Sequence, residues 1–171
     1  AVSCVVCVPG KFSVGTASSC SSCGVGQYVT TSNATACISC DLGSFTTSEQ
    51  TDADGVGIST GASFCVSCPV GYFGATVGPM CTQCVANSAT AAPGSTHLAQ
   101  CLCMAGYVGT LLSTSDFCAS CPAGKYKAVI GSDNCIDCIA GKYIDTTSSD
   151  DASDCIDCVV GKYVDVSGSD A

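Results

Sequence analysis

The sequence lacks tryptophan and arginine, has a single histidine, and contains no run of the roughly 18 apolar residues that a transmembrane helix needs. Its five basic side chains are all lysines, and with 14 acidic residues the formal net charge is −9. This balance argues against nucleic acid or an anionic membrane as a partner, and the lack of a long apolar run argues against membrane insertion. The sequence shows no phosphate-binding loop and no catalytic constellation, so we expect a protein that is not an enzyme and has no cofactor.

Large apolar side chains are scarce as well. Leucine, isoleucine, phenylalanine and methionine number only 19 of 171 residues, too few for one globular core. The chain instead has 18 cysteines, a fraction typical of disulfide scaffolds. Because disulfides persist in oxidising compartments, we expect an extracellular or cell-surface protein. The absence of an initiator methionine and of a signal peptide indicates a mature or excised segment.

The cysteines form a repeat. They fall into nine close pairs: Cys4/Cys7, Cys20/Cys23, Cys37/Cys40, Cys65/Cys68, Cys81/Cys84, Cys101/Cys103, Cys118/Cys121, Cys135/Cys138 and Cys155/Cys158. From the second cysteine of most pairs the motif C-x-x-G-x-aromatic follows, as in "CVPGKF", "CPAGKY" and "CIAGKY". The period is about 19 residues, and such a period is typical of repeat architectures.

Each position of the motif has a physical reason. The glycine suits a turn that needs positive φ, and Asn87, which replaces it once, is the next best residue type for that conformation. The aromatic residue is expected to begin a short strand and cover a disulfide. The Ser, Thr, Asn and Asp residues that follow are typical of hairpin loop tips. Helical signals are confined to one or two turns at most, near Gly94–Cys103.

The sequence therefore predicts a small disulfide-rich fold of tandem short β-hairpin modules. We expect these modules to form an elongated rod with little or no helix, because each hairpin is too small to be stable alone. We also expect each module to contact only its immediate neighbours, as in other repeat proteins.

The motif resembles known extracellular modules. C-x-x-G-x-[FY], followed by about eight residues and C-x-x-C, resembles the ephrin-receptor-like cysteine-rich repeats and the first half-module of tumour-necrosis-factor receptor repeats. The stretch C-x-C-x-x-G-Y-x-G, Cys101 to Gly109, resembles the end of an epidermal growth factor-like domain. The resemblance covers essentially the whole chain. Strings of such modules are common in large extracellular proteins of algae and other protists, including ones thought to build surface coats and flagellar hairs.

Four segments are expected on this basis. Residues 1–40 carry cysteine-rich repeats, and residues 41–80 carry repeats with a long insert loop. Residues 81–121 form a growth-factor-like segment, and residues 122–171 form regular acidic repeats.

The disulfide pairing is narrowed by the repeat. A bond within C-x-x-C closes a very small ring, which disfavours that pairing. Pairing in blocks of four needs an even number of cysteine pairs, whereas this chain has nine. The remaining simple scheme joins the second cysteine of each pair to the first of the next, and it matches the hairpin bridge in both families that the motif resembles. The predicted bonds are Cys7–Cys20, Cys23–Cys37, Cys40–Cys65, Cys68–Cys81, Cys84–Cys101, Cys103–Cys118, Cys121–Cys135 and Cys138–Cys155.

Other candidate sites are weaker. Zinc ribbons bind the metal through two C-x-x-C pairs, but nine pairs leave one without a partner. Redox enzymes carry C-x-x-C on a βαβ frame, and no such frame is visible, so we favour disulfides. Asp52 and Asp54 in "TDADGVG" are a weak calcium candidate that lacks the further acidic ligands of a complete loop. We expect His97 to be a surface residue. We also expect glycans, above all at Asn33 in the sequon Asn33-Ala34-Thr35.

Two functions remain open at this stage. The first is a structural extracellular protein, a disulfide-laddered rod that forms part of a filament or surface coat, such as a flagellar hair. The second is a ligand-binding or adhesive ectodomain, for which the irregular segments Ser44–Phe64 and Asn87–Gln100 are the places to look. The same modules serve receptors, adhesins and fibres, so the resemblance does not choose between them. We favour the structural protein, because the modules are nearly uniform and the sequence shows no singular site.

The nearest-neighbour scheme leaves Cys4 and Cys158 without partners. If a second copy followed directly, 17 residues would separate Cys158 from the next Cys4, the separation already found between Cys138 and Cys155. We therefore expect the chain to be its own partner, with Cys158 bonded to Cys4 of the next copy. The two copies would be joined in one longer polypeptide or head-to-tail between subunits, and a head-to-tail contact generates a filament unless it closes into a ring.

Overall fold

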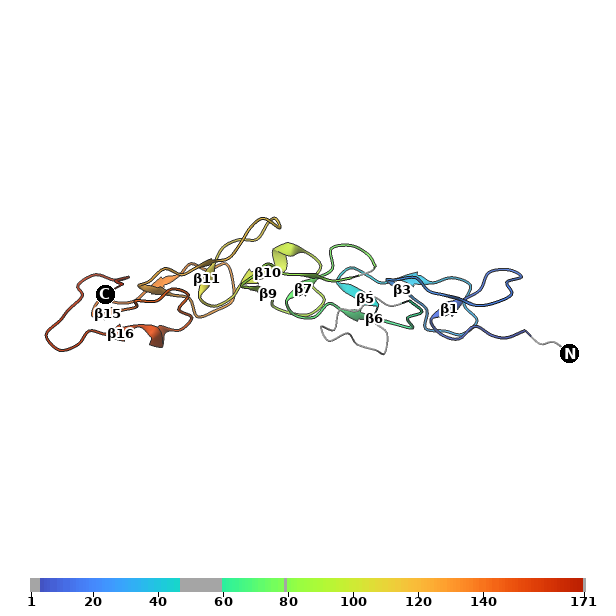
Figure 1. Cartoon of the computed structure of the whole chain (residues 1–171), viewed down its shortest axis with the longest axis horizontal. Helices are drawn as coiled ribbons and strands as arrows, with labels where there is room; N and C mark the ends of the chain where they lie inside the picture. Colours follow the sequence, from blue (N-terminus) through green and yellow to red (C-terminus); the bar gives the residue numbers. More distant parts are fainter. Residues whose placement is uncertain (1–3, 47–59, 79, 171) are drawn as a thin grey trace. The chain divides into compact units, whose positions relative to one another are not determined.

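The computed structural model describes residues 4–46, 60–78 and 80–170. Within these residues the secondary structure consists of two-stranded antiparallel hairpins and two short 3-10 helices. Within each part of the chain the hairpins succeed one another in sequence order, as the strand labels in Figure 1 show. The prediction of small disulfide-rich tandem β-hairpin modules with little helix is confirmed.

The strands are two or three residues long and pair in sequence order. They are β1 (Lys11–Phe12) with β2 (Ser21–Ser22), β3 (Gln27–Tyr28) with β4 (Ile38–Ser39), β5 (Ser44–Thr46) with β6 (Cys65–Ser67), β7 (Tyr72–Phe73) with β8 (Thr82–Gln83), β9 (Ser88–Thr90) with β10 (Cys101–Cys103), β11 (Tyr107–Val108) with β12 (Ala119–Ser120), β13 (Lys125–Tyr126) with β14 (Ile136–Asp137), and β15 (Lys142–Tyr143) with β16 (Ile156–Asp157). The 3-10 helix η1 (Leu98–Gln100) lies where the sequence predicts a helical turn, whereas η2 (Ala152–Asp154) was not expected.

Eight disulfides close the hairpins, and they join the same cysteines as the nearest-neighbour scheme, from Cys7–Cys20 to Cys138–Cys155. Their Cα–Cα distances of 5.6 to 5.8 Å are ordinary for disulfides. We number the modules 1 to 9 by the cysteine that begins each one: Cys7, Cys23, Cys40, Cys68, Cys84, Cys103, Cys121, Cys138 and Cys158.

Disulfides also make up most of the core. Twelve of the eighteen buried apolar residues in the described part of the chain are cysteines. The larger apolar side chains sit against them: Phe45 packs with Cys68 and Cys81, and Ile144 packs with Cys138 and Cys155. A fold assembled from such small cores needs few large apolar residues, which accounts for their scarcity in the sequence.

One backbone hydrogen bond recurs at the open end of the hairpins, opposite the connecting loop. In six modules the N–H of the cysteine that closes the C-x-x-C donates to the carbonyl of the motif glycine in the preceding module, for example Cys138 N–H to Gly124 at 2.9 Å. In module 5 the Met104 N–H bonds to the carbonyl of Asn87. Asn87 has φ of 60°, which confirms that it takes the place of the glycine.

Cross-strand neighbours in several hairpins pair an aromatic ring with a branched aliphatic side chain. The pairs are Tyr28 with Ile38, Phe45 with Val66, Tyr126 with Ile136, and Tyr143 with Ile156. In modules 7 and 8 an ion pair lies beside them, Lys125 with Asp137 and Lys142 with Asp157. Aromatic and β-branched partners stabilise a strand pair, whereas exposed ion pairs add little.

The chain divides into two compact units. The first comprises Ala1–Gln83 and Ala92–His97, and the second comprises Cys84–Ala91 and Leu98–Ala171. The first unit thus contains modules 1 to 4, and the second contains modules 6 to 9. The division into four segments made from the sequence stays a prediction.

Candidate functional site

The recurring feature of this structure is the interface between consecutive modules. Between modules 7 and 8 three backbone hydrogen bonds add to the Cys138–Gly124 bond described above: Gly124 N–H to Ile144 O at 2.8 Å, Lys127 N–H to Ser149 O at 3.1 Å, and Ser148 N–H to Cys121 O at 2.9 Å. Ser148 has a positive φ of 63° and forms the tip of the loop in module 8. The predicted loop tips are therefore docked against the preceding module.

Equivalent bonds recur in both units. The N–H of the motif glycine donates to a carbonyl of the next module in the pairs Gly10 to Val29, Gly43 to Gly74, and Gly106 to Lys127. The N–H of the residue after the aromatic position does so in the pairs Ser13 to Ala34, Val29 to Ala62, and Gly74 to Ser95. The N–H of the loop tip donates to the first cysteine of the preceding module in the pairs Asn33 to Cys7, Gly61 to Cys23, Gly94 to Cys68, and Gly131 to Cys103. The donors and acceptors of these bonds belong to the main chain, whereas between modules 2 and 3 the Gly26 N–H donates to the Thr46 hydroxyl oxygen at 3.0 Å. The interface therefore tolerates different side chains as long as the tip residue can adopt positive φ.

Five loop tips also reach the module two before their own. A Cβ atom added to Gly124 of module 7 would lie 2.1 Å from the carbonyl oxygen of Gly168 in module 9. The same close approach relates Gly10 to Gly61, Gly26 to Gly78, Gly43 to Gly94, and Gly106 to Ser148. The expectation that modules contact only their immediate neighbours is wrong, because the motif glycine leaves room for the backbone of a second module.

Lys127 is a buried cation in the second unit that the sequence analysis did not single out. Its side chain is 1% exposed, and its Nζ donates to the carbonyl oxygens of Cys103 at 3.2 Å, Tyr107 at 2.7 Å and Gly131 at 2.6 Å. Burial lowers the pKa of Lys127, and the charge of Asp133 opposes this shift. Lys127 occupies the position that Val29 and Ile144 fill elsewhere, and it links modules 6 and 7 through three carbonyls.

Lys127→Met is expected to destabilise the second unit by about 1–3 kcal/mol, because three carbonyl oxygens lose their donor. Lys11→Met is the matched control, since Lys11 is exposed and its replacement should change stability by less than about 0.5 kcal/mol. Denaturant unfolding followed by hydrogen exchange at the Gly131 amide measures both variants. Equal stability of the two variants would contradict a stabilising role for the buried ammonium.

Module 9 is the half-module at residues 158–170, and it docks as the complete modules do. Gly141 N–H donates to Val164 O at 2.8 Å, Ile144 N–H to Ser169 O at 3.3 Å, and Gly168 N–H to Cys138 O at 2.9 Å. All three types of interface bond are thus present. These backbone hydrogen bonds hold the half-module, which has no disulfide of its own among the described residues.

The free edge of module 9 exposes apolar surface. No strand pairs with Lys162–Tyr163 in the part of the chain that the structure describes, and the side chain of Tyr163 is 83% exposed. The equivalent Tyr126 and Tyr143 are half-buried. A hollow of about 280 Å³ lies beside this edge and is lined by Tyr143, Cys158, Val159, Lys162, Tyr163 and Val164. Cys158 is a free, half-buried thiol, and Cys4 is a free, exposed thiol.

The structure places the other predicted residues as follows. Asn33 is exposed at the loop tip of module 2, with φ of 63°, and its side chain is accessible to a glycan. His97 is exposed, and its Nδ1 lies 2.6 Å from the Thr96 hydroxyl. The calcium candidates Asp52 and Asp54, and the middle of the segment Ser44–Phe64, lie outside the described residues.

Mass spectrometry of the native protein is expected to find an N-glycan on the Asn33 peptide that peptide N-glycosidase removes. Asn87 is an internal control because it has a nearly identical φ of 60° but no sequon. Its peptide should have the bare mass. An unmodified Asn33 peptide in native material would contradict the prediction.

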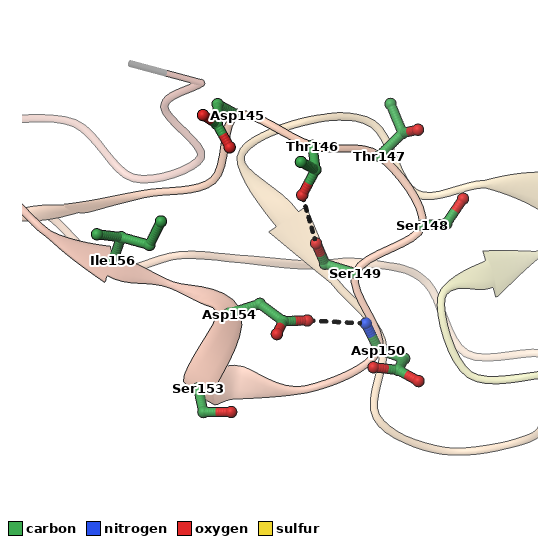
Figure 2. Close-up of a pocket in the computed structure, with 9 residues that line it drawn as sticks. All are labelled: Asp145, Thr146, Thr147, Ser148, Ser149, Asp150, Ser153, Asp154 and Ile156. Carbon is green, nitrogen blue, oxygen red and sulfur yellow. Dashed lines mark hydrogen bonds between the residues drawn. The ribbon is translucent and has the colours of Figure 1, made fainter.

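An acidic hollow of about 490 Å³ lies beside η2 and is lined by Asp145, Thr146, Thr147, Ser148, Ser149, Asp150, Ser153, Asp154 and Ile156 (Figure 2). Its carboxylates serve the local backbone. Asp154 accepts from the N–H groups of Asp150 and Asp151 at 3.2 Å, and Asp151 accepts from the Ser153 N–H at 2.7 Å. The Ser153 N–H holds the pKa of Asp151 below its usual value. This arrangement is a capping box that begins η2.

In the described part of the chain, no group of three or more His, Cys, Asp and Glu side chains is arranged to hold a metal ion. None of the helices there has both the length and the apolar character needed to cross a membrane.

The fold and its repeated interface define a class, the disulfide-rich repeat arrays. Residues 109–155, which lie in modules 6 to 8, match the family model described as tyrosine-protein kinase ephrin type A/B receptor-like. This match, which covers less than half of the chain, and the ladder of disulfides support a cysteine-rich ephrin-receptor-like repeat array. None of the curated proteins compared with the chain matches it. Modules of this kind indicate an extracellular ligand-binding or structural domain and are typically non-enzymatic.

Proposed function

We propose that the chain is a structural protein of an extracellular filament or surface coat, built from modules that continue head to tail. The repeated backbone interface supports this proposal most directly, because the same three hydrogen bonds join modules 1 and 2, join modules 7 and 8, and also hold the half-module at residues 158–170. A repeat that is joined mainly through main-chain groups is suited to indefinite extension. The ladder of eight disulfides would make such a filament resistant to denaturants.

Electron microscopy of the native material tests the proposal. Fibres that survive urea and shorten or dissolve when a reductant is added are the expected result. Compact monomers under all conditions would exclude a filament. Antibody labelling against residues 158–170 and against the Cys20–Cys37 region, counted along single fibres, would show whether copies repeat at a fixed interval.

A ligand-binding ectodomain is the second candidate function. The match of residues 109–155 to the ephrin type A/B receptor-like family favours it, because that family is named for receptors. For this function we place the ligand at the loop of module 6, because that loop departs from the repeat. Its Asp116 carboxylate accepts hydrogen bonds from the N–H groups of Leu112 and Ser113, both at 2.7 Å. Compact monomers that bind a soluble partner through this loop would favour the second function over the first.

A further inference from the structure

Loop tips lie against one residue of an earlier cysteine pair, which we call the joint residue. It is the residue before the second cysteine in the C-x-x-C where the preceding module begins. A Cβ atom added to the tip glycine would meet the joint residue in three modules: Gly61 with Ser22 at 3.6 Å, Gly94 with Ser67 at 3.7 Å, and Gly168 with Asp137 at 2.8 Å. These three tips have φ of 74°, 79° and 76°. The joint residue is therefore a regular neighbour of the tip.

Module 7 has no joint residue to lie against. The module before it begins at Cys101-Leu102-Cys103, the single C-x-C of the chain, which is one residue shorter than the other cysteine pairs. The tip of module 7, Gly131, has φ of 153° instead of the usual value near 75°. A Cβ added there would lie 3.3 Å from the carboxylate of Asp133 in its own loop. The shortened pair thus coincides with a tip that has lost its usual neighbour.

The same tip also lacks a glycine two modules before it. In modules 3, 5, 8 and 9 the tip carbonyl oxygen approaches a motif glycine, and a Cβ on that glycine would fill the space. The motif position two modules before module 7 is Asn87, which has a Cβ and a glycine-like φ of 60°. A carbonyl oxygen cannot come as close to this position as it does to the glycines. The carbonyl of Gly131 therefore needs a different partner.

Lys127 is that partner. Its ammonium donates to the carbonyl of Gly131 at 2.6 Å and to the carbonyl of Cys103 at 3.2 Å, so it connects the tip of module 7 with the shortened pair. A third bond goes to the carbonyl of Tyr107 in module 6 at 2.7 Å. Modules 2 and 8 have Val29 and Ile144 at this position, and neither side chain is a donor. A long side chain that ends in three donors suits a junction from which one residue is missing.

We propose that Lys127 is a specificity-determining residue of the array, which allows module 7 to dock on a module that begins with C-x-C. The ammonium takes the place of the absent joint residue, so the need for a lysine depends on the spacing of a cysteine pair 24 residues earlier. An aliphatic residue at this position suits a preceding module that begins with C-x-x-C. The inference concerns the order of modules within one chain and is independent of the filament proposed above.

A one-residue insertion tests this dependence. A serine inserted between Leu102 and Cys103 restores the C-x-x-C spacing and supplies a joint residue. Lys127→Met is then introduced into the original chain and into the inserted chain, and denaturant unfolding of all four full-length chains is measured. In the original chain the substitution should raise the unfolding constant of the second unit about tenfold or more, because three carbonyls lose a charged donor. In the inserted chain it should raise that constant less than about threefold. Equal changes in the two chains overturn the proposal.

Ile144→Met is the matched control in the same two chains. Ile144 has the position of Lys127 in module 8, and the module before it begins with the complete pair Cys118/Cys121. The insertion should therefore leave the effect of Ile144→Met unchanged, as expected for independent sites. An effect of Ile144→Met that falls as much as that of Lys127→Met would mean that the insertion acts on the whole unit, and this result would also overturn the proposal.

Hydrogen exchange decides the question even if the inserted chain does not fold. The amides of Gly131 and Ser148 make the same bond to the preceding module, to Cys103 at 3.0 Å and to Cys121 at 2.9 Å. Because loop tips open locally, Lys127→Met in the original chain should make the Gly131 amide exchange about tenfold faster or more and the Ser148 amide less than about threefold faster. Equal acceleration of the two amides would show that Lys127 only stabilises the unit as a whole, and the proposal would be wrong.

Discussion

Gly124→Ala is expected to lower the free energy of unfolding of the C-terminal modules by about 3 kcal/mol, whereas Gly141→Ala should lower it by only about 1–2 kcal/mol. The two glycines occupy the same motif position and have nearly the same backbone, with φ of 83° and 88°. Both variants therefore carry a similar penalty for positive φ at a residue other than glycine.

The two positions differ in their neighbours. The new Cβ at position 124 would lie 2.1 Å from the Gly168 carbonyl oxygen, whereas the Cβ at position 141 would meet nothing within 4 Å. The first variant must therefore displace the backbone of module 9, and overpacking against backbone costs about 1–3 kcal/mol. Denaturant unfolding measures the difference, and hydrogen exchange of the Gly168 amide locates it. Equal losses for both variants would show that the close approach has no energetic role.

Removal of the Cys138–Cys155 disulfide is expected to destabilise modules 7 to 9 by about 3 kcal/mol, because the open loop regains conformational entropy in the unfolded state. Both cysteines are replaced together by alanine, so that no new free thiol can exchange with its neighbours. The loss should also uncover Ile144, which is 1% exposed and packs against this bond. Proteolysis within residues 144–155 under native conditions should become faster.

The matched control removes the two cysteines that have no partner in the single chain. The double replacement of Cys4 and Cys158 by serine leaves every bond of the ladder in place and should not change the stability of the monomer. If this control and the Cys138/Cys155 variant were equally stable, the disulfide ladder would not be what stabilises the fold.

The spacing of cysteine, glycine and aromatic residue was enough to predict the hairpins, because each residue has a local role in its own module. Asn87 illustrates this point: its substitution for glycine predicts positive φ, and the structure has it. The docking of loop tips could not be predicted in this way. The sequence explains Gly10 fully as a turn residue, and nothing local shows that the carbonyl of Gly61 lies against it.

Lys127 was missed for a different reason. A lysine after "GKY" reads as a polar residue at the start of a loop, and only comparison with Val29 and Ile144 at the same register shows that the position is buried. The three carbonyls that bind it belong to residues 103, 107 and 131, and their convergence depends on the tertiary fold. The edge of module 9 was partly predictable, since the unpaired Cys158 indicates it, but the exposed Tyr163 and its hollow come from the structure.

The bridge across every hairpin has a mechanical consequence. Under tension the load passes from one cysteine to the next through the disulfide, which spans 5.8 Å between Cα atoms in module 8, and then through three residues of C-x-x-C. These three residues extend to about 10 Å, so an oxidised module lengthens to roughly 16 Å at most. A reduced module of about 19 residues could extend to roughly 65 Å. Oxidation therefore limits each module to about a quarter of the length that it can reach when reduced, and a reductant would turn the same sequence into a compliant tether.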